Sequence, residues 1–235
     1  MRSTAKSAAR RSGEAGRLLQ SCRGINDFGE RLERLSARLL ELPYINNPLG
    51  GGPDEREAMV IRFDGFDCVT YVETALALAL SREADQFTDA LREMRYRDGE
   101  VDWRSRNHYM LDWIKQNQRR GIVKNITSGP HTVTKMRRLS LIKELPAKSA
   151  AFRVFPKRTL PHVRRVAQTG DIALFASTRR NLDVFHMGFL IRRGDDLWLR
   201  HASRTSGRVV EQPLTEFLKA QRTSGIILLR PLCQP

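Results

Sequence analysis

Five short β-type runs follow one another after residue 170, and they constrain the fold of this chain more than any other feature. The runs are GDIALFAS, DVFHMGFLI, DLWLRHAS, GRVVEQ and GIILLRP, with turn residues between them. Such spacing is typical of antiparallel strands. Because segments with helical periodicity precede them, we expect an α+β fold with a helical part at 25–168 and an antiparallel β-sheet part at 169–235.

The turn IRRGDDL, residues 191–197, predicts a β-hairpin between two of these runs. A two-residue loop at 194–195 suits a type II′ turn, because its first residue is glycine. A loop at 193–194 is the alternative. Both registers place His186 and His201 on one face of the sheet, as diagonal neighbours in the first case and directly opposite in the second.

The face that holds the two histidines is expected to be an inner face of the sheet. Its apolar members are Val184, Leu190, Leu197 and Leu199. A helix that starts at Cys68 is the expected cover, because its apolar stripe needs a sheet to pack on. With the N-terminus of that helix over the hairpin, Cys68 and the two histidines would converge.

Helical periodicity marks the first half of the chain. Apolar residues recur at helical spacing from Phe28 to Leu42, and Pro43 stops that helix. Asp67 is a favourable N-cap, which makes Cys68 the first residue of a second helix. We expect helices at 25–43, 68–82, 86–96 and 105–121, a short strand or extended segment at 58–66, a loop at 44–55, and little regularity at 122–168.

A cysteine that begins a helix close to a histidine can act as a nucleophile. The helix N-terminus stabilises a thiolate, and an imidazole within hydrogen-bond reach takes the thiol proton and later protonates a leaving amine. We assign Cys68 as nucleophile, His186 as general base and His201 as the residue that orients this base. The Cys68 backbone N–H is the expected oxyanion donor. The alternative is structural, since a helix-start cysteine or a strand histidine is more often a packing or surface residue, and geometry alone leaves both interpretations open.

These residues resemble the motifs of the NlpC/P60 superfamily of papain-like cysteine peptidases and amidases. In that family an Asp-Cys pair opens a helix, as in FDCVTYVE, and a Gly-Asp strand follows, as in TGDIALF. A His-x-Gly strand and a strand with a His-Ala pair come next, as in VFHMGFLI and RHAS. The resemblance implies a papain-like fold with Cys68, His186 and His201 as catalytic residues, and a site that needs neither a metal nor an organic cofactor.

The stretch between nucleophile and base indicates one branch of that superfamily. His186 follows Cys68 by 118 positions, a longer gap than in compact members, which implies an inserted helical region. The motif SRNHYMLDW in this region, together with FDGFDCVTYVE, resembles the DUF1460 branch, whose members are described as N-acetylmuramoyl-L-alanine amidase-like. The resemblance implies a single catalytic domain at 25–235.

Further residues near these motifs are candidates for substrate binding. An aromatic residue that precedes the nucleophile often contacts the substrate amine in related enzymes, although it can equally anchor a loop. The residues of the SRNHYMLDW motif can line a cleft or form one side of an amphipathic helix. The candidates are Tyr44, Asp67, Arg106, Asn107, His108 and Tyr109.

Composition limits the partners and the cellular setting. The net charge of +15 favours an anionic partner, or reflects a general abundance of arginine. Three cysteines without CxxC spacing favour free thiols over a disulfide framework or a cysteine zinc site. We expect residues 1–24 to be a mobile basic tail without a secretory signal, and no transmembrane segment. This indicates a cytoplasmic protein by default, or one in the periplasm or cell envelope if it is exported or the start is misassigned.

Three functions remain in competition at this stage. The first is a cysteine hydrolase that cleaves an amide bond in peptidoglycan or muropeptides, as an N-acetylmuramoyl-L-alanine amidase or a γ-D-glutamyl endopeptidase does. The second is an acyltransferase on the same fold that acts on lipids or other acceptors. The third is a non-enzymatic basic binding protein, although the sequence has no recognised nucleic-acid motif.

Overall fold

The structure is a computed structural model that describes residues 12–233. The chain divides into two compact units. Of the described residues, unit 1 comprises 12–106 and 202–210, and unit 2 comprises 107–201 and 211–233. The predicted boundary near residue 168 therefore lies inside unit 2.

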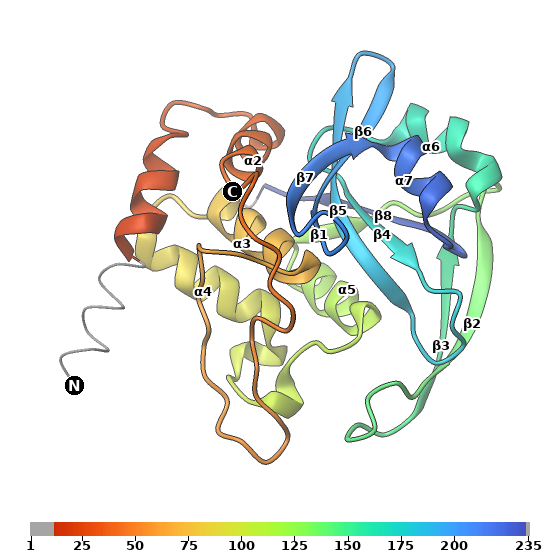
Figure 1. Ribbon diagram of the computed structural model, residues 1–235, viewed down its shortest axis with the longest axis horizontal. Coiled ribbons are helices and arrows are strands. Elements are labelled where there is room, and N and C mark those ends of the chain that lie inside the picture. The colour runs from red at the N-terminus through yellow and green to blue at the C-terminus, as the bar shows by residue number, and fades with distance from the viewer. Residues whose placement is uncertain (1–11, 234–235) are drawn as a thin grey trace. The chain divides into compact units, whose positions relative to one another are not determined.

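Unit 1 is built around one buried helix. Helix α3 (Cys68–Leu80) packs against α2 (Phe28–Ala37) and α4 (Ala84–Arg95), as Figure 1 shows. Every side chain of α3 from residue 70 to residue 79 is buried, so this helix is covered on all sides rather than along one apolar stripe. The buried ion pair between Arg95 and Glu73 joins α4 to α3.

The segment before α2 differs from the expected tail. Residues 12–20 are helical, and Ala15, Leu19 and Cys22 are buried. Apolar burial therefore orders the chain from residue 12 onward, and the rest of the expected tail lies outside the described residues. The segment 58–66 is extended without a strand ladder, which fits the extended alternative. Two short helical turns complete this unit, η1 (Arg97–Gly99) and η2 (Trp103–Ser105).

Most of the predicted antiparallel sheet belongs to unit 2. Six strands lie in the order β1-β8-β4-β5-β6-β7, and Figure 1 shows β4 and β5 side by side at its centre. The last five strands in the chain coincide with the five β-type runs. The strands are β1 (Val123–Asn125), β4 (Ile172–Ala176), β5 (Val184–Arg193), β6 (Asp196–Ser203), β7 (Arg208–Pro213) and β8 (Gly225–Pro231).

The region inserted between nucleophile and base is not wholly helical. Besides α5 (Met110–Arg119), η3 (Lys157–Thr159) and α6 (Leu160–Val166), it holds strand β1 and a separate two-stranded sheet of β2 (Val133–Leu139) and β3 (Lys148–Val154). Half-buried and exposed positions alternate along most of β2, which suits a ribbon with one exposed face. Basic side chains occur at both kinds of position, Lys135 and Arg137 at half-buried ones and Arg138 at an exposed one, and this obscured the strand pattern in the sequence.

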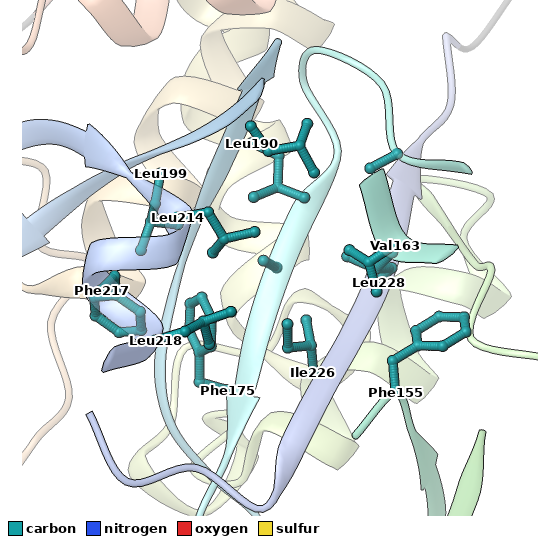
Figure 2. Close-up of a cluster of buried hydrophobic side chains, with 13 residues drawn as sticks. Phe155, Val163, Phe175, Leu190, Leu199, Leu214, Phe217, Leu218, Ile226 and Leu228 are labelled. Atoms are coloured by element: carbon teal, nitrogen blue, oxygen red, sulfur yellow. The ribbon is translucent and has the colours of Figure 1, made fainter. Parts of the chain in front are cut away.

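One face of the sheet is covered by helices of the same unit. Figure 2 shows Val163 of α6 and the α7 (Leu214–Ala220) residues Leu214, Phe217 and Leu218 packed against Phe175 and its neighbours on the strands. Leu190, Leu197 and Leu199 belong to the same cluster. The inner face was therefore predicted correctly, and the helices that cover it are α6 and α7, where the helix from Cys68 was expected.

The positive charge of the protein belongs almost entirely to unit 2. The described residues of this unit carry 22 basic and 8 acidic residues, a net charge of +14, whereas those of unit 1 carry 15 basic and 18 acidic residues, a net charge of −3. Residues 113–170 alone hold 14 basic residues and one acidic residue, Glu144. Basic residues are common in both units, so a scarcity of acidic residues is what distinguishes unit 2.

Candidate active site

The start of helix α3 is fixed by a capping box. The Asp67 side chain accepts a hydrogen bond from the Thr70 backbone N–H at 2.8 Å, and the Thr70 hydroxyl lies 3.1 Å from the Asp67 backbone nitrogen, which donates to it. This geometry makes Cys68 the first helical residue, as the sequence predicted. The Asp67 carboxylate is thus engaged in holding the helix end.

Cys68 differs from the other two cysteines in its surroundings. Cys22 is buried and 3% exposed, and Cys233 is exposed near the C-terminus. Cys68 is half-buried at the end of an otherwise buried helix. None of these three cysteines, all within the described residues, forms a disulfide bond. A helix N-terminus with partial exposure is the setting in which a thiolate is stabilised and can still be reached.

Tyr44 lies beside this helix start. Its backbone N–H donates to the Gly207 carbonyl at 2.8 Å, and it forms an isolated parallel bridge with Phe66. Burial raises the pKa of Tyr44, and the nearby acidic groups of Cys68 and Asp67 raise it further. Unit 1 therefore brings three predicted site residues, Tyr44, Asp67 and Cys68, together.

Arg204, which was not among the predicted site residues, lies near Tyr44. Arg204 is exposed on the turn between β6 and β7, and its charge lowers the pKa of Tyr44 in opposition to the larger effects. The bond from Tyr44 to Gly207 ties this turn to the helix start. An exposed turn arginine looks like any surface arginine in the sequence, so only the pairing of residues 43–44 with 207–208 reveals its position.

Unit 2 brings the two predicted histidines into direct contact. Arg193 pairs with Asp196, which is the hairpin register with the loop at 194–195, and Gly194 has the positive φ that a type II′ turn needs. His186 and His201 are therefore diagonal neighbours on one face, as that register predicts. The Nε2 of His186 lies 2.6 Å from the Nδ1 of His201, with the two rings nearly perpendicular.

A β-bulge precedes His186. Phe175 of β4 pairs with His186, but the next residue, Ala176, pairs with Val184, so Phe185 is the extra residue. Phe175 and Ala176 point to opposite faces, and so do His186 and Val184. The expectation that Val184 shares the histidine face was therefore wrong, because a bulge that the sequence does not announce reverses the alternation.

Gly188 explains the glycine of the His-x-Gly motif. A Cβ at this position would lie 2.7 Å from the Arg200 carbonyl oxygen and 2.8 Å from the His201 Cβ. Such distances are far below van der Waals contact, so only glycine lets β5 approach β6 here without displacement. Gly188 thereby allows His201 to occupy its observed place.

Aromatic rings and burial hold the histidine pair in its neutral form. The Phe217 ring lies 5.4 Å from each imidazole, and Phe175 lies 6.2 Å from that of His186. Burial, and then the proximity of His201, lowers the pKa of His186 to about 3, and burial lowers the pKa of His201 to about 4. A neutral imidazole has one ring nitrogen with a lone pair, which a general base requires, and a thiolate beside it would raise the pKa of the imidazole again.

Gln212 extends the pair and was not among the predicted residues. Its amide nitrogen lies 2.8 Å from the His201 Nε2. The residue is at the end of β7, directly before α7, which carries Phe217. The pattern GRVVEQP shows a strand in the sequence, but it does not show which strand side chain meets a histidine.

The remaining predicted residues lie in the segment before α5. Arg106 is bonded within unit 1, where it donates to Glu57 at 3.2 Å and to the Gly50 carbonyl at 3.1 Å. Tyr109 is buried, and its hydroxyl accepts from the Ile142 backbone N–H at 3.2 Å. Asn107 and His108 are half-buried. Arg106 thus holds the glycine-rich loop and Tyr109 anchors the chain before β3.

The residues that the structure describes, 12–233, can be searched for membrane-spanning helices and for metal sites. Within this range, no helix has both the length and the apolar composition of a transmembrane segment. The same range contains no cluster of three or more histidine, cysteine, aspartate or glutamate side chains arranged to bind a metal ion.

Comparison with known proteins gives matches over most of the chain. The AmiA-like family, described as N-acetylmuramoyl-L-alanine amidase-like, matches residues 34–226. An N-acetylmuramoyl-L-alanine amidase from Bacteroides uniformis is 30% identical with a TM-score of 0.78, and the match covers 87% of this chain and 98% of that chain. Among curated proteins, none matches this sequence.

Two other solved structures are similar. A Legionella pneumophila protein of the DUF1460 family is 24% identical with a TM-score of 0.83, and the match covers 98% of this chain and 99% of that one. A Bacteroides fragilis protein named as a xylanase is 30% identical with a TM-score of 0.72, covering 83% and 98%. The predicted resemblance to the DUF1460, amidase-like branch is confirmed by the family match.

Proposed function

The chain belongs to the N-acetylmuramoyl-L-alanine amidase-like family, and from this premise we propose that it is a cysteine-dependent amidase acting on peptidoglycan or muropeptides. The observation that carries the proposal is the part-buried contact of 2.6 Å between His186 and His201. Two imidazoles in this arrangement form a base and its orienting partner. The placement in the NlpC/P60 superfamily is part of the same proposal.

The reaction begins with proton transfer from the Cys68 thiol to the Nδ1 of His186. The sulfur attacks the amide carbonyl carbon, and the backbone N–H groups at the start of α3 stabilise the resulting oxyanion. The C–N bond then breaks, the His186 imidazolium gives its proton to the leaving amine, and a thioester remains on Cys68. Water hydrolyses the thioester with His186 as base, which releases a carboxylate and restores the thiol.

The favoured bond joins the lactyl group of muramic acid to L-alanine. In this case the glycan is the acyl half and the stem peptide leaves through its alanine amine. Tyr44 and Arg204 are proposed to contact the substrate next to Cys68, since stem peptides carry carboxylates that an arginine binds. Asp67 contributes by fixing the start of α3, and Asn107 and His108 remain candidates for substrate contact.

The charge of unit 2 supports an anionic polymer as substrate. A net charge of +14 on this unit raises the local concentration of a negatively charged polymer at its surface. The name of the Bacteroides fragilis protein suggests glycoside hydrolysis, which uses two carboxylates at the scissile bond. A thiol and a histidine pair suit acyl transfer instead, and this favours the amidase.

Digestion of purified peptidoglycan and of free muropeptides, followed by mass spectrometry, tests the proposed function. The wild type is expected to release intact stem peptides that begin with L-alanine, and the Cys68→Ala variant to release none. Peptides that lack L-alanine and D-glutamate would instead identify a γ-D-glutamyl endopeptidase. Full activity of Cys68→Ala would refute cysteine catalysis, and the Cys233→Ala variant is the matched control.

A further inference from the structure

Gln212, His201 and His186 form a continuous line of polar contacts. The Gln212 amide nitrogen is 2.8 Å from the His201 Nε2, and the His201 Nδ1 is 2.6 Å from the His186 Nε2. His201 is 2% exposed, so solvent has little access to replace either partner. Both ring nitrogens of His201 are thus committed to protein groups.

This line can carry hydrogen bonds in only one direction at a time. A neutral imidazole has one ring proton, so it donates from one nitrogen and accepts at the other. If the Gln212 amide N–H donates, His201 accepts at Nε2, donates from Nδ1 to His186, and leaves the ring proton of His186 on Nδ1. If the Gln212 carbonyl oxygen accepts, His201 donates from Nε2, and His186 donates from its own Nε2.

Only the second direction leaves His186 able to act as a base. The Nε2 of His186 is engaged with His201, so its Nδ1 is the ring nitrogen left to take a proton from a thiol. In the first direction that nitrogen already bears a proton. In the second it carries a lone pair, and when it is protonated no other proton along the line has to move.

We propose that Gln212 is a positioning residue whose carbonyl oxygen accepts the His201 Nε2–H and so keeps the ring proton of His186 on Nε2. A rotation of 180° about the last side-chain bond exchanges the amide oxygen and nitrogen, so the position 2.8 Å from His201 can hold either atom. The inference rests on the proposed function, because it assigns a direction to the hydrogen bonds of that site.

The segment that carries Gln212 also sets the planes of the two rings. Phe217 follows on α7, and its ring lies 5.4 Å from each imidazole centroid. Residues 212–217 thus supply both the apolar Phe217 ring that contacts the imidazoles and the polar Gln212 amide at the end of their hydrogen bonds. Tautomer and orientation are then controlled from one stretch of chain, residues 212–217, which is the role that a third catalytic group plays in hydrolase triads.

Two substitutions separate acceptance from donation at this position. Gln212→Glu can only accept, so it preserves the proposed direction, whereas Gln212→Met has similar length and does neither. The first readout is the ¹⁵N chemical shifts of the His186 ring nitrogens, which report the tautomer without any substrate. We expect a proton on Nε2 in the wild type and in Gln212→Glu, and a mixture of tautomers in Gln212→Met.

Kinetics with a muropeptide amide provide the second readout. Gln212→Met is expected to lower kcat several-fold with KM nearly unchanged, because only part of the enzyme then holds His186 in its basic tautomer and substrate contacts are kept. Gln212→Glu should retain most of kcat and move the acidic limb of the pH–rate profile upward, since a carboxylate favours protonated histidines. Gln118→Met, at an exposed position of α5, is the matched control.

The tautomer measurement tests the role of Gln212, and the activity of Cys68→Ala tests the proposed function, so the two can fail independently. A wild-type His186 with its proton on Nδ1, or a Gln212→Met variant with the wild-type tautomer, would overturn the role of Gln212 even if the enzyme is an amidase. Full activity of Cys68→Ala would instead overturn the amidase and leave the tautomer result intact. If Gln212→Met does not fold, loss of the Nε2–H tautomer in Gln212→Glu alone contradicts the inference.

Discussion

Gly188 and His201 approach each other so closely that a methyl group on Gly188 would lie 2.8 Å from the Cβ of His201. The two residues lie on adjacent strands, and the hairpin loop at Gly194 fixes their register. The glycine therefore controls where the orienting histidine lies, although it has no side chain to take part in chemistry. The His-x-Gly motif thus combines a base with the space that its partner requires.

The substitution Gly188→Ala should displace β6 and separate the histidines. We expect a loss of about 1–3 kcal/mol in the free energy of unfolding, as for other overpacked sites. Amidase activity should fall about 100-fold, because small displacements of a catalytic group are costly. Denaturant unfolding measures the loss of stability, and kinetics measure the loss of activity. Gly16→Ala is the control, because nothing lies within 4 Å of a Cβ there. Equal effects from the two variants would contradict the role of Gly188.

The histidine pair should make stability depend on pH. Burial lowers the folded-state pKa of His186 to about 3 and that of His201 to about 4, below the ordinary value of 6.5. Between these values the unfolded chain binds protons that the folded chain does not, so the free energy of unfolding falls as the pH drops below about 6.5. Urea unfolding should show that the free energy of unfolding falls less between pH 7 and pH 5 in His186→Gln than in the wild type. In the control variant His131→Gln, at an exposed site, the free energy of unfolding should fall as much as in the wild type. Identical decreases in all three proteins would contradict the role of His186 and His201 in the pH dependence.

The elements with simple periodicity were predictable from sequence alone. The helix beginning at Cys68, its Asp67 cap and the strands after residue 170 follow directly from apolar spacing and turn residues. Strands β2 and β3 were missed, because basic residues at both exposed and half-buried positions hide their alternation. The covering role of α6 and α7 depends on tertiary packing, which local patterns do not encode.

Arg204 should affect substrate affinity more than turnover. It lies on the turn that is tied to Tyr44, next to the helix start at Cys68. We expect Arg204→Ala to raise KM for a carboxylate-bearing muropeptide about tenfold, the equivalent of one charge-assisted hydrogen bond. kcat should change little, and Arg204→Lys should be intermediate. A fall in kcat with KM unchanged would show that Arg204 acts on the transition state instead.

The basic surface of unit 2 should strengthen binding to the wall polymer. Reversing four exposed cations there is expected to weaken co-sedimentation with insoluble peptidoglycan roughly tenfold at low salt, and added salt should reduce the difference. Reversal of four exposed cations of unit 1 is the control, and an equal loss in that variant would contradict the assignment. The test set is Lys124, Arg138, Lys143 and Arg158, and the control set is Arg34, Arg38, Arg56 and Arg82, all changed to Glu.

The candidate site was predictable in part, and the reason lies in chain distance. His186 and His201 belong to one hairpin, so period-two alternation and a short turn were enough to place them together. Gln212 joins them from another strand and Arg204 joins Tyr44 from another turn. Contacts of that kind depend on strand order and loop path, which no local pattern specifies.

The pH dependence of Cys68 alkylation by iodoacetamide, measured peptide by peptide with mass spectrometry in the wild type and in His186→Ala, tests most directly whether Cys68 and His186 act as one catalytic pair. We predict a wild-type thiol pKa below the ordinary value of about 8.5, and a return toward that value with slower labelling near pH 6 in the variant. Cys233 supplies an internal reference, because it is exposed and labels in both proteins. Superimposable Cys68 profiles in the two proteins would contradict the pair.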